Sequence, residues 1–176
     1  VTFSIALGLL LAVFIYQNRI LNGLLKFLYF SPWVTPLVAV SIIWVFMFDK
    51  DGIINYLLSF LGIPKTAWLG SSKTALIPIM VVTIWTSVGW NMIFYLGALS
   101  RVPKDLYEAA EIDGVSSVAM FRKITLPFIS PTTLFLVVVS TIGALQAYSQ
   151  IQVMTQGGPS GSTRTLLYLY YLNAFE

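Results

Sequence analysis

The sequence contains no cysteine and no histidine. The absence of cysteine excludes disulfide bonds and thiolate nucleophiles, and the absence of histidine excludes imidazole proton relays and histidine-based metal sites. Much enzyme chemistry depends on these two residue types. We therefore expect no catalytic residue and no metal site in this chain.

Charge is also scarce in this sequence. Only 10% of the residues are charged, against about 25% in an average soluble domain, whereas 57% are hydrophobic and the mean hydropathy is +0.84. The basic residues are scattered between apolar stretches, so the net charge of +3 does not indicate nucleic-acid binding. Lysine and arginine side chains that reach from a membrane edge to water explain this distribution. The composition therefore predicts a membrane protein.

Long uncharged runs set the expected fold. The runs at residues 27–48 and 74–100 are long enough for a spanning helix, which needs about 20 apolar residues. We expect an all-α, polytopic transmembrane helix bundle forming one domain over residues 1–176. The expected spans are residues 1–16, 27–48, 75–100, 127–149 and the opening of a fifth from about residue 165. The first run has no initiator methionine or basic leader, so we interpret it as a truncated span of a longer protein rather than a signal peptide.

Proline and glycine predict where these spans bend and turn. Pro32 and Pro36 open the second span, and Pro127 and Pro131 open the fourth, so both are expected to enter the membrane bent. The stretch TQGGPSGST at residues 155–163 predicts a turn.

The link between the second and third spans contains the short amphipathic stretch INYLLSFLG, with Trp68 downstream at a plausible membrane interface. Two interpretations of this stretch stay open. It rests on the membrane surface, or it forms part of a docking surface for an extracytoplasmic partner.

Eight charged residues gather within residues 101–123. Because each charge at a bilayer centre costs about 2.5 to 3.5 kcal/mol, this segment cannot lie in lipid. If residues 17–26 and 101–125 face the cytoplasm, that side carries six Lys/Arg residues and the other side four, so the positive-inside rule favours a cytoplasmic location. We name residues 101–125 the charged loop.

The charged loop predicts two helices that meet at a glycine. Pro103 suits a first helical turn, Asp105 suits the positive end of the helix dipole, and Gly114 suits a left-handed end, which together predict a helix over residues 103–113. Ser116 or Ser117 can cap a second helix that runs to a boundary at Pro127.

The first of these helices has features that favour a partner. Ala109 and Ala110 keep its outer surface low enough for a groove to accept it closely, and Glu108 offers a carboxylate to a basic partner. The alternative is an ordinary interfacial helix, which needs neither alanine.

The same segment carries an ordered pattern: EAA, three residues, glycine, nine residues, then I-x-L-P. This pattern resembles the EAA loop of the permeases of binding-protein-dependent ABC importers. The Gly-Gly-Pro run at residues 157–159, the Thr-Leu pair at 165–166 and the Ala-Phe pair at 174–175 are similar to the sugar-uptake branch, namely the maltose-type and glycerol-3-phosphate-type first permease subunits. The similarity extends over essentially the whole chain.

This resemblance implies a type I ABC importer permease core in a bacterial inner membrane, with a cytoplasmic coupling helix that lies in a cleft of an ATPase. It implies as partners a second, related permease subunit in a heterodimer, two ABC ATPase subunits, an extracytoplasmic solute-binding protein, membrane lipid and a sugar-type solute. ATP and Mg²⁺ would bind to the ATPases, and this sequence has no GxxxxGKS/T run to hold phosphates. The residues that would carry the coupling role are Glu108, Ala109, Ala110, Asp113, Gly114, Ile124, Leu126 and Pro127.

A polar and aromatic stripe in the third span is the candidate substrate path. Thr83, Thr86, Ser87, Trp90 and Asn91 recur at i, i+3, i+4, i+7 and i+8, so they share one helix face. Polar groups are costly in lipid, so this face should meet protein or a water-filled cavity. The fourth span adds Gln146 and Tyr148 near its outer end.

A structural interpretation of the same residues stays open. Threonine and serine hydroxyls also hydrogen-bond to the preceding helical turn or hold helices together, and Gly89 with Gly97 allows close packing. Trp33, Trp44 and Trp85 are expected to face lipid, neighbouring helices or the interface.

Three other functions compete with the permease interpretation. An intramembrane enzyme needs acids or bases inside the spans, and the expected spans hold none. A channel or secondary transporter would work without an ATPase partner. A purely structural membrane protein explains the hydrophobicity but not the ordered EAA pattern.

Overall fold

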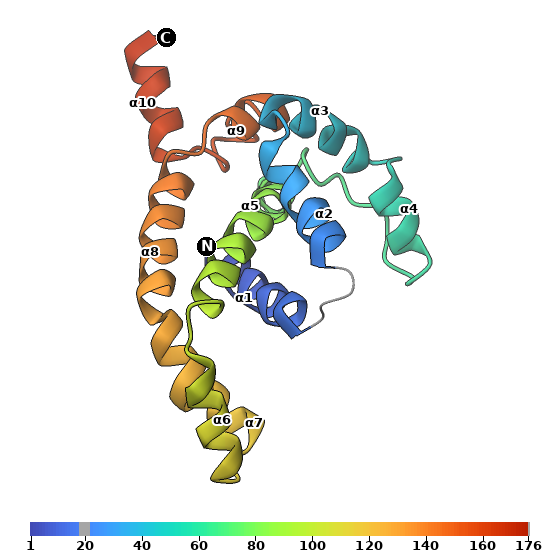
Figure 1. The fold of residues 1–176 in the computed structure, drawn as a ribbon. Coiled ribbons are helices and arrows are strands. Elements are labelled where there is room, and N and C mark those ends of the chain that lie inside the picture. Colours follow the sequence, from blue (N-terminus) through green and yellow to red (C-terminus); the bar gives the residue numbers. More distant parts are fainter. Residues whose placement is uncertain (18–21, 176) are drawn as a thin grey trace. The chain divides into compact units, whose positions relative to one another are not determined.

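The computed structural model describes residues 1–17 and 22–175, and within them the chain forms helices and turns and no strand. Arg19, counted above on the cytoplasmic side, lies outside the described residues. The elements are α1 (Thr2–Gln17), α2 (Asn22–Val34), α3 (Leu37–Met47), α4 (Ile53–Ser59), α5 (Leu76–Leu99), α6 (Lys104–Ile112), α7 (Ser117–Met120), the π-helix η1 (Phe121–Thr125), α8 (Leu126–Leu145), α9 (Ser149–Met154) and α10 (Leu166–Phe175) (Figure 1). The all-α prediction is confirmed.

The helices pack as two compact units. The first unit comprises the described part of Val1–Trp33 together with Thr86–Ser140, and the second comprises Val34–Trp85 together with the chain from Thr141 onward. Both α5 and α8 contribute one part to each unit. The single-domain assignment of the chain stays a prediction.

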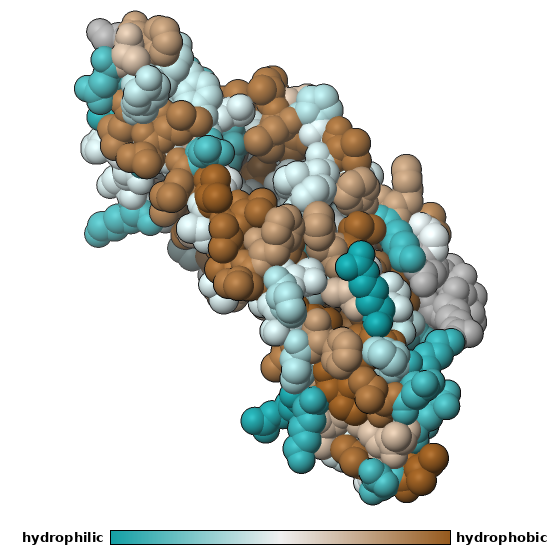
Figure 2. Space-filling view, turned by 60° about the vertical axis from the view of Figure 1, so that its left-hand side comes forward, coloured by the Kyte–Doolittle hydropathy of each residue, from teal (hydrophilic) through white to brown (hydrophobic). Residues whose placement is uncertain are grey.

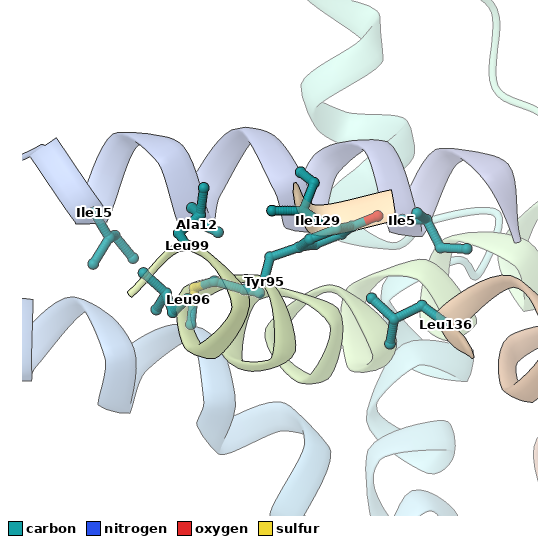
Figure 3. Close-up of a cluster of buried hydrophobic side chains, with 9 residues drawn as sticks. Ile5, Ala12, Ile15, Tyr95, Leu96, Leu99, Ile129 and Leu136 are labelled. Carbon is teal, nitrogen blue, oxygen red and sulfur yellow. The ribbon is translucent and has the colours of Figure 1, made fainter. Parts of the chain in front are cut away.

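The core of the first unit lies where α1, α5 and α8 meet. Tyr95 and Leu99 of α5 lie against α1, with Ile129 and Leu136 of α8 closing the cluster (Figure 3). In a membrane, lipid tails are as apolar as these side chains, so close van der Waals contact rather than water exclusion holds such helices together. Small residues of α1 permit that contact: a Cβ atom on Gly8 would lie only 2.5 Å from Cβ of Asn91.

The second unit has its own apolar core. Helix α3 packs against α9, and Tyr168 of α10 is buried in the same cluster. The other buried members are Val40, Ile79, Val82, Ile151 and Met154. The turn predicted at residues 155–163 is present between α9 and α10, with Gly157 in a left-handed conformation at φ 76°.

The predicted spans agree with the structure in part. Within the described residues, two helical stretches are long and apolar enough to cross a membrane, Leu76–Leu99 and Ser117–Leu145, and a third counts if a broken pair of helices is one span. The prediction of the third span is therefore confirmed. The first and last apolar helices, Thr2–Gln17 and Leu166–Phe175, are shorter.

The second span is more sharply broken than the sequence predicted. Gly23–Val34 and Leu37–Met47 meet at 95°, and Pro36 is the N-cap of α3 at φ −55° and ψ 119°. A residue that precedes proline is pushed out of the helical region, which explains the break at Thr35. The predicted bend of the second span is confirmed, although the sequence alone does not distinguish a kink from a break of this size.

Large apolar side chains cover much of the exterior. Phe3, Phe27 and Phe46 are each about 70% exposed, and Figure 2 shows apolar surface over wide areas of the face it presents, with hydrophilic side chains in separate patches. Exposed apolar area of this extent marks a membrane or protein contact in a stable fold. The exterior therefore fits a lipid environment.

Candidate functional site

The charged loop contains a short helix whose start is set by proline. Helix α6 begins after Pro103, which is its N-cap at φ −60° and ψ 131°, and Asp105 lies in its first turn. The sequence predicted that Pro103 is the first residue of the helix, whereas the helix begins one residue later, at Lys104. Asp105 lies where the helix dipole favours a negative charge, as predicted.

The end of α6 is fixed by Gly114. Its φ of 68° is left-handed. The N–H of Val115 donates to the carbonyl of Ala110 at 2.9 Å, and the N–H of Gly114 donates to that of Glu111 at 3.0 Å. These two bonds form a Schellman motif, which satisfies carbonyls at the end of the helix. The predicted helix end is confirmed.

A second helix follows almost at once, as predicted. Oγ of Ser116 accepts a hydrogen bond from the N–H of Ala119 at 3.4 Å and caps α7. In Figure 1, α6 and α7 lie together beyond the end of α5.

This second helix does not stop at Pro127, so that predicted boundary was wrong. It widens into the π-helix η1, where the N–H of Leu126 donates to the carbonyl of Phe121, and it continues through α8 to Leu145. A proline ring clashes with the carbonyl four residues earlier, and the wider turn before Pro127 gives that carbonyl more room. The fourth span also ends before the predicted residue 149.

The EAA residues do not all face outward. Glu108 and Ala109 are exposed, whereas Ala110 is buried. The prediction that both alanines lie on the outer surface was therefore wrong for Ala110, because residues one apart on a helix point in directions about 100° apart. The remaining residues of the pattern are placed as follows: Asp113, Gly114, Leu126 and Pro127 are exposed, and Ile124 is half-buried.

A side-chain hydrogen bond joins α6 to the end of η1, directly before α8. Oη of Tyr107 and Oγ1 of Thr125 are 2.8 Å apart and share a hydrogen bond, and Thr125 is buried. No sequence pattern predicts this pair, since the two residues are far apart in the chain and neither is a fixed position of the EAA pattern. Their contact means that α6 cannot move freely from the start of α8.

The charged loop also exposes apolar and basic groups side by side. Ile112 is 87% exposed and Val118 is 71% exposed. A hollow of about 460 Å³ is lined by Ser116, Val118, Ala119, Arg122 and Lys123. An exposed mixture of this kind is typical of a protein contact, in which apolar side chains are surrounded by charges.

The candidate substrate path divides between the two units. In the first unit, Trp90 stacks on Trp33 of α2 with ring centroids 4.7 Å apart, and Phe94 continues the row at 4.6 Å from Trp90 and 5.4 Å from Phe135. The sequence did not predict the partnership of Trp33 with Trp90, because a contact between helices leaves no periodic signal. These four rings form an aromatic row over α2, α5 and α8.

Asn91 does not line an open path in this structure. Its side chain is fully buried, Gly8 of α1 lies against its Cβ, and neither amide atom has a hydrogen-bond partner. The sequence predicted that this helix face meets protein or a water-filled cavity, and at Asn91 in this structure it meets α1. Of the other residues of this stripe, Thr86 is buried and Ser87 is half-buried.

The second unit holds the remaining candidates. Oγ1 of Thr83 donates to the carbonyl of Ile79 at 2.7 Å, which fits the structural interpretation of that hydroxyl. The ring of Tyr148 lies 5.6 Å from that of Tyr168 and 4.9 Å from that of Tyr171. Gln146 is exposed and lines an apolar hollow of about 510 Å³ with Ile142, Leu145, Leu166, Leu167 and Tyr170.

Comparison with known families gives a match over almost the whole chain. Residues 4–175 match the family described as "Binding-protein-dependent transport system inner membrane component".

Several characterised or named proteins are similar in sequence. The lactose transport system permease protein LacF of Rhizobium radiobacter is 39% identical over 98% of this chain and 60% of its own length. The trehalose/maltose transport system permease protein MalF of Thermococcus litoralis is 33% identical over 97% of this chain and 58% of its own length. The sn-glycerol-3-phosphate transport system permease protein UgpA of Yersinia pestis is 33% identical over 96% of this chain and 59% of its own length. The chain therefore spans about 60% of these relatives.

A solved structure shares the fold. It is a bacterial ABC transporter involved in the import of the acidic polysaccharide alginate, with a TM-score of 0.79 and 24% identity over 98% of this chain and 65% of that chain.

Proposed function

We infer the function of this chain from the family to which it belongs, the binding-protein-dependent transport system inner membrane components, whose match covers residues 4–175. The proposal is that the chain is a permease subunit of an ABC importer in a bacterial inner membrane. It would translocate a sugar or related polyol that an extracytoplasmic binding protein delivers. The family match is the observation that carries this proposal, and the named relatives support the solute class.

The charged loop would receive the work of ATP hydrolysis. In this proposal α6 lies in a cleft of an ATPase subunit, with the exposed Glu108 toward basic groups of the ATPase and Ala109 allowing close approach. Asp113, Gly114 and the I-x-L-P residues of the pattern would keep α6 at a fixed angle to α8. The Tyr107–Thr125 hydrogen bond gives a displacement of α6 a direct route to the start of α8.

The solute would pass along polar and aromatic side chains inside the transporter. The aromatic row that includes Trp90 offers ring faces to the apolar faces of a sugar, and hydroxyl or amide groups such as Ser87 and Gln146 offer hydrogen bonds to its hydroxyls. The helices α5 and α8 carry no charged residue, which favours a neutral solute. Asn91 would join this path only in a conformation in which α1 moves away from it.

The remaining parts of the importer would be separate chains. The proposal includes a related second permease subunit, two ABC ATPase subunits that bind ATP and Mg²⁺, and the solute-binding protein. This chain would then hydrolyse nothing itself and would hold no cofactor of its own.

Replacement of Glu108 tests the proposal directly. The assembled transporter is reconstituted in liposomes with Glu108→Gln, and uptake and ATPase activity are measured with and without the solute-binding protein. We expect loss of binding-protein-stimulated ATPase activity and of uptake, because a charge-assisted hydrogen bond across the α6 contact is removed. Glu111→Gln is the matched control, since Glu111 is exposed on the same helix but lies outside the EAA pattern.

Equal activity of the Glu108→Gln protein and the control would contradict the coupling role. Transport by this chain without any nucleotide-binding partner would contradict the importer proposal as a whole and favour a channel or secondary transporter.

A further inference from the structure

The short helix α4 exposes its apolar side. The stripe comprises Ile53, Tyr56 and Leu57 of α4 and Phe60 and Leu61 of the turn that follows it. These residues recur at i, i+3, i+4, i+7 and i+8, and every one is between 53% and 75% exposed. A helix on a water-soluble surface buries such a stripe against the core. Here the apolar stripe is exposed instead of buried, so it requires an apolar environment outside this chain.

The opposite side of α4 faces inward and is anchored by Asn55, with Ile54 and Leu58 half-buried beside it. This side chain is buried, and its Nδ2 donates to the carbonyls of Asp49, Lys50 and Thr66 at 3.2, 3.0 and 2.8 Å. Its Oδ1 accepts from the N–H of Thr66 at 3.2 Å and from Nε1 of Trp68 at 3.0 Å. These contacts hold α4 in one orientation. The fold of the link itself therefore keeps the stripe exposed.

Charged residues flank the stripe but are absent from it. Lys65 forms an ion pair with Asp51, and the resulting hydrogen bond and charge attraction hold the pKa of the Asp51 carboxyl below its ordinary value. The link joins the end of α3 at Met47 to the start of α5 at Leu76. Trp68 donates to Asn55 of α4, and Oγ1 of Thr74, two residues before α5, donates to the carbonyl of Trp68 at 2.8 Å, so these contacts hold α4 near the start of the membrane-spanning helix α5.

We propose that the apolar stripe of α4 lies in the interfacial layer of the phospholipid bilayer, at the membrane surface next to the N-terminal end of α5, as an anchor that does not span the membrane. Lipid fits better than a reversibly docking solute-binding protein, because a reversible protein contact is only about as apolar as an average surface and has a polar rim. The single polar atom of the stripe is the Tyr56 hydroxyl, and tyrosine is enriched at membrane interfaces. The proposal depends on the membrane location of the family and not on the transport function or the solute.

Spin labelling tests the position of the stripe. Leu57→Cys and, as the control on the charged side of the link, Lys65→Cys are each labelled with a nitroxide in the full-length transporter, after any reactive cysteine elsewhere in the complex has been replaced by serine. The protein is reconstituted in phosphatidylethanolamine and phosphatidylglycerol liposomes. Collision rates with oxygen, which concentrates in lipid, and with a water-soluble nickel chelate are then measured with and without the solute-binding protein.

We expect an oxygen-to-nickel ratio several-fold higher at position 57 than at position 65, unchanged by the binding protein. Equal ratios at the two positions would overturn the proposal. Access of nickel to position 57 that is lost when the binding protein is added would also overturn it, and would assign the stripe to protein docking. Both positions are exposed, so the labels do not disturb packing, and the ion pair that Lys65→Cys removes is not one of the contacts that orient α4.

Discussion

Gly114 shows how one backbone angle sets the shape of the charged loop. At φ 68° the chain turns out of α6, and the two hydrogen bonds of the Schellman motif depend on that turn. A Cβ atom added at this position would meet nothing within 4 Å. The requirement for glycine is therefore conformational and not a matter of space.

Replacement of Gly114 tests whether glycine is required there for its conformation or for lack of space. We expect Gly114→Ala to destabilise the turn by about 1 to 2 kcal/mol, since a left-handed conformation costs that much for a residue with a Cβ atom. Hydrogen exchange of the Val115 amide should then accelerate about 5- to 30-fold. Gly114→Asn is the matched variant and should show a smaller effect, because asparagine adopts this conformation more readily. Equal protection of Val115 in all three proteins would contradict the assignment.

At the scale of the helices, close crossings depend on glycine at particular positions. A Cβ atom on Gly89 of α5 would lie 1.8 Å from the carbonyl oxygen of Tyr29 in α2. Gly97, two turns further along α5, would meet nothing within 4 Å. The sequence treated these two glycines alike, and only the packing of α2 against α5 distinguishes them.

This difference predicts opposite effects of the same substitution. Gly89→Ala should lower the free energy of unfolding by about 1 to 3 kcal/mol or more, because backbone must move to admit the methyl group. Gly97→Ala should leave it unchanged or raise it by up to about 1 kcal/mol, since alanine favours the helix. Thermal unfolding of the purified protein in detergent measures both. A similar loss in the two variants would show that α2 and α5 do not cross at Gly89.

At the scale of the whole molecule, the chain must place its polar links on two sides of a membrane. Because α5 is a spanning helix, the link before it and the charged loop after it should face opposite compartments. The excess of Lys/Arg in the charged loop and in the link 17–26 favours the cytoplasm for that side.

Cysteine labelling checks this arrangement in a chain that has no cysteine of its own. Ser72→Cys precedes α5, Ser116→Cys lies in the charged loop, and both positions are exposed. In right-side-out membrane vesicles a membrane-impermeant maleimide should label position 72 at once and position 116 only after permeabilisation. Labelling of position 116 from outside would place the charged loop where no cytoplasmic ATPase can reach it.

The sequence by itself determined the membrane class, the position of α5 and the two helices of the charged loop. These follow from local causes: apolar runs longer than a bilayer, a proline before α6, a glycine that ends it and a serine that caps α7. Each cause acts within a few residues, so each leaves a signal that can be read along the chain.

Only the tertiary structure decided which side chains are accessible. It buried Ala110 and Asn91, paired Tyr107 with Thr125 and Trp33 with Trp90, and turned the apolar side of α4 outward around Asn55. These outcomes depend on contacts between segments far apart in the chain, and periodicity reports the faces of a helix but not which neighbour covers each face.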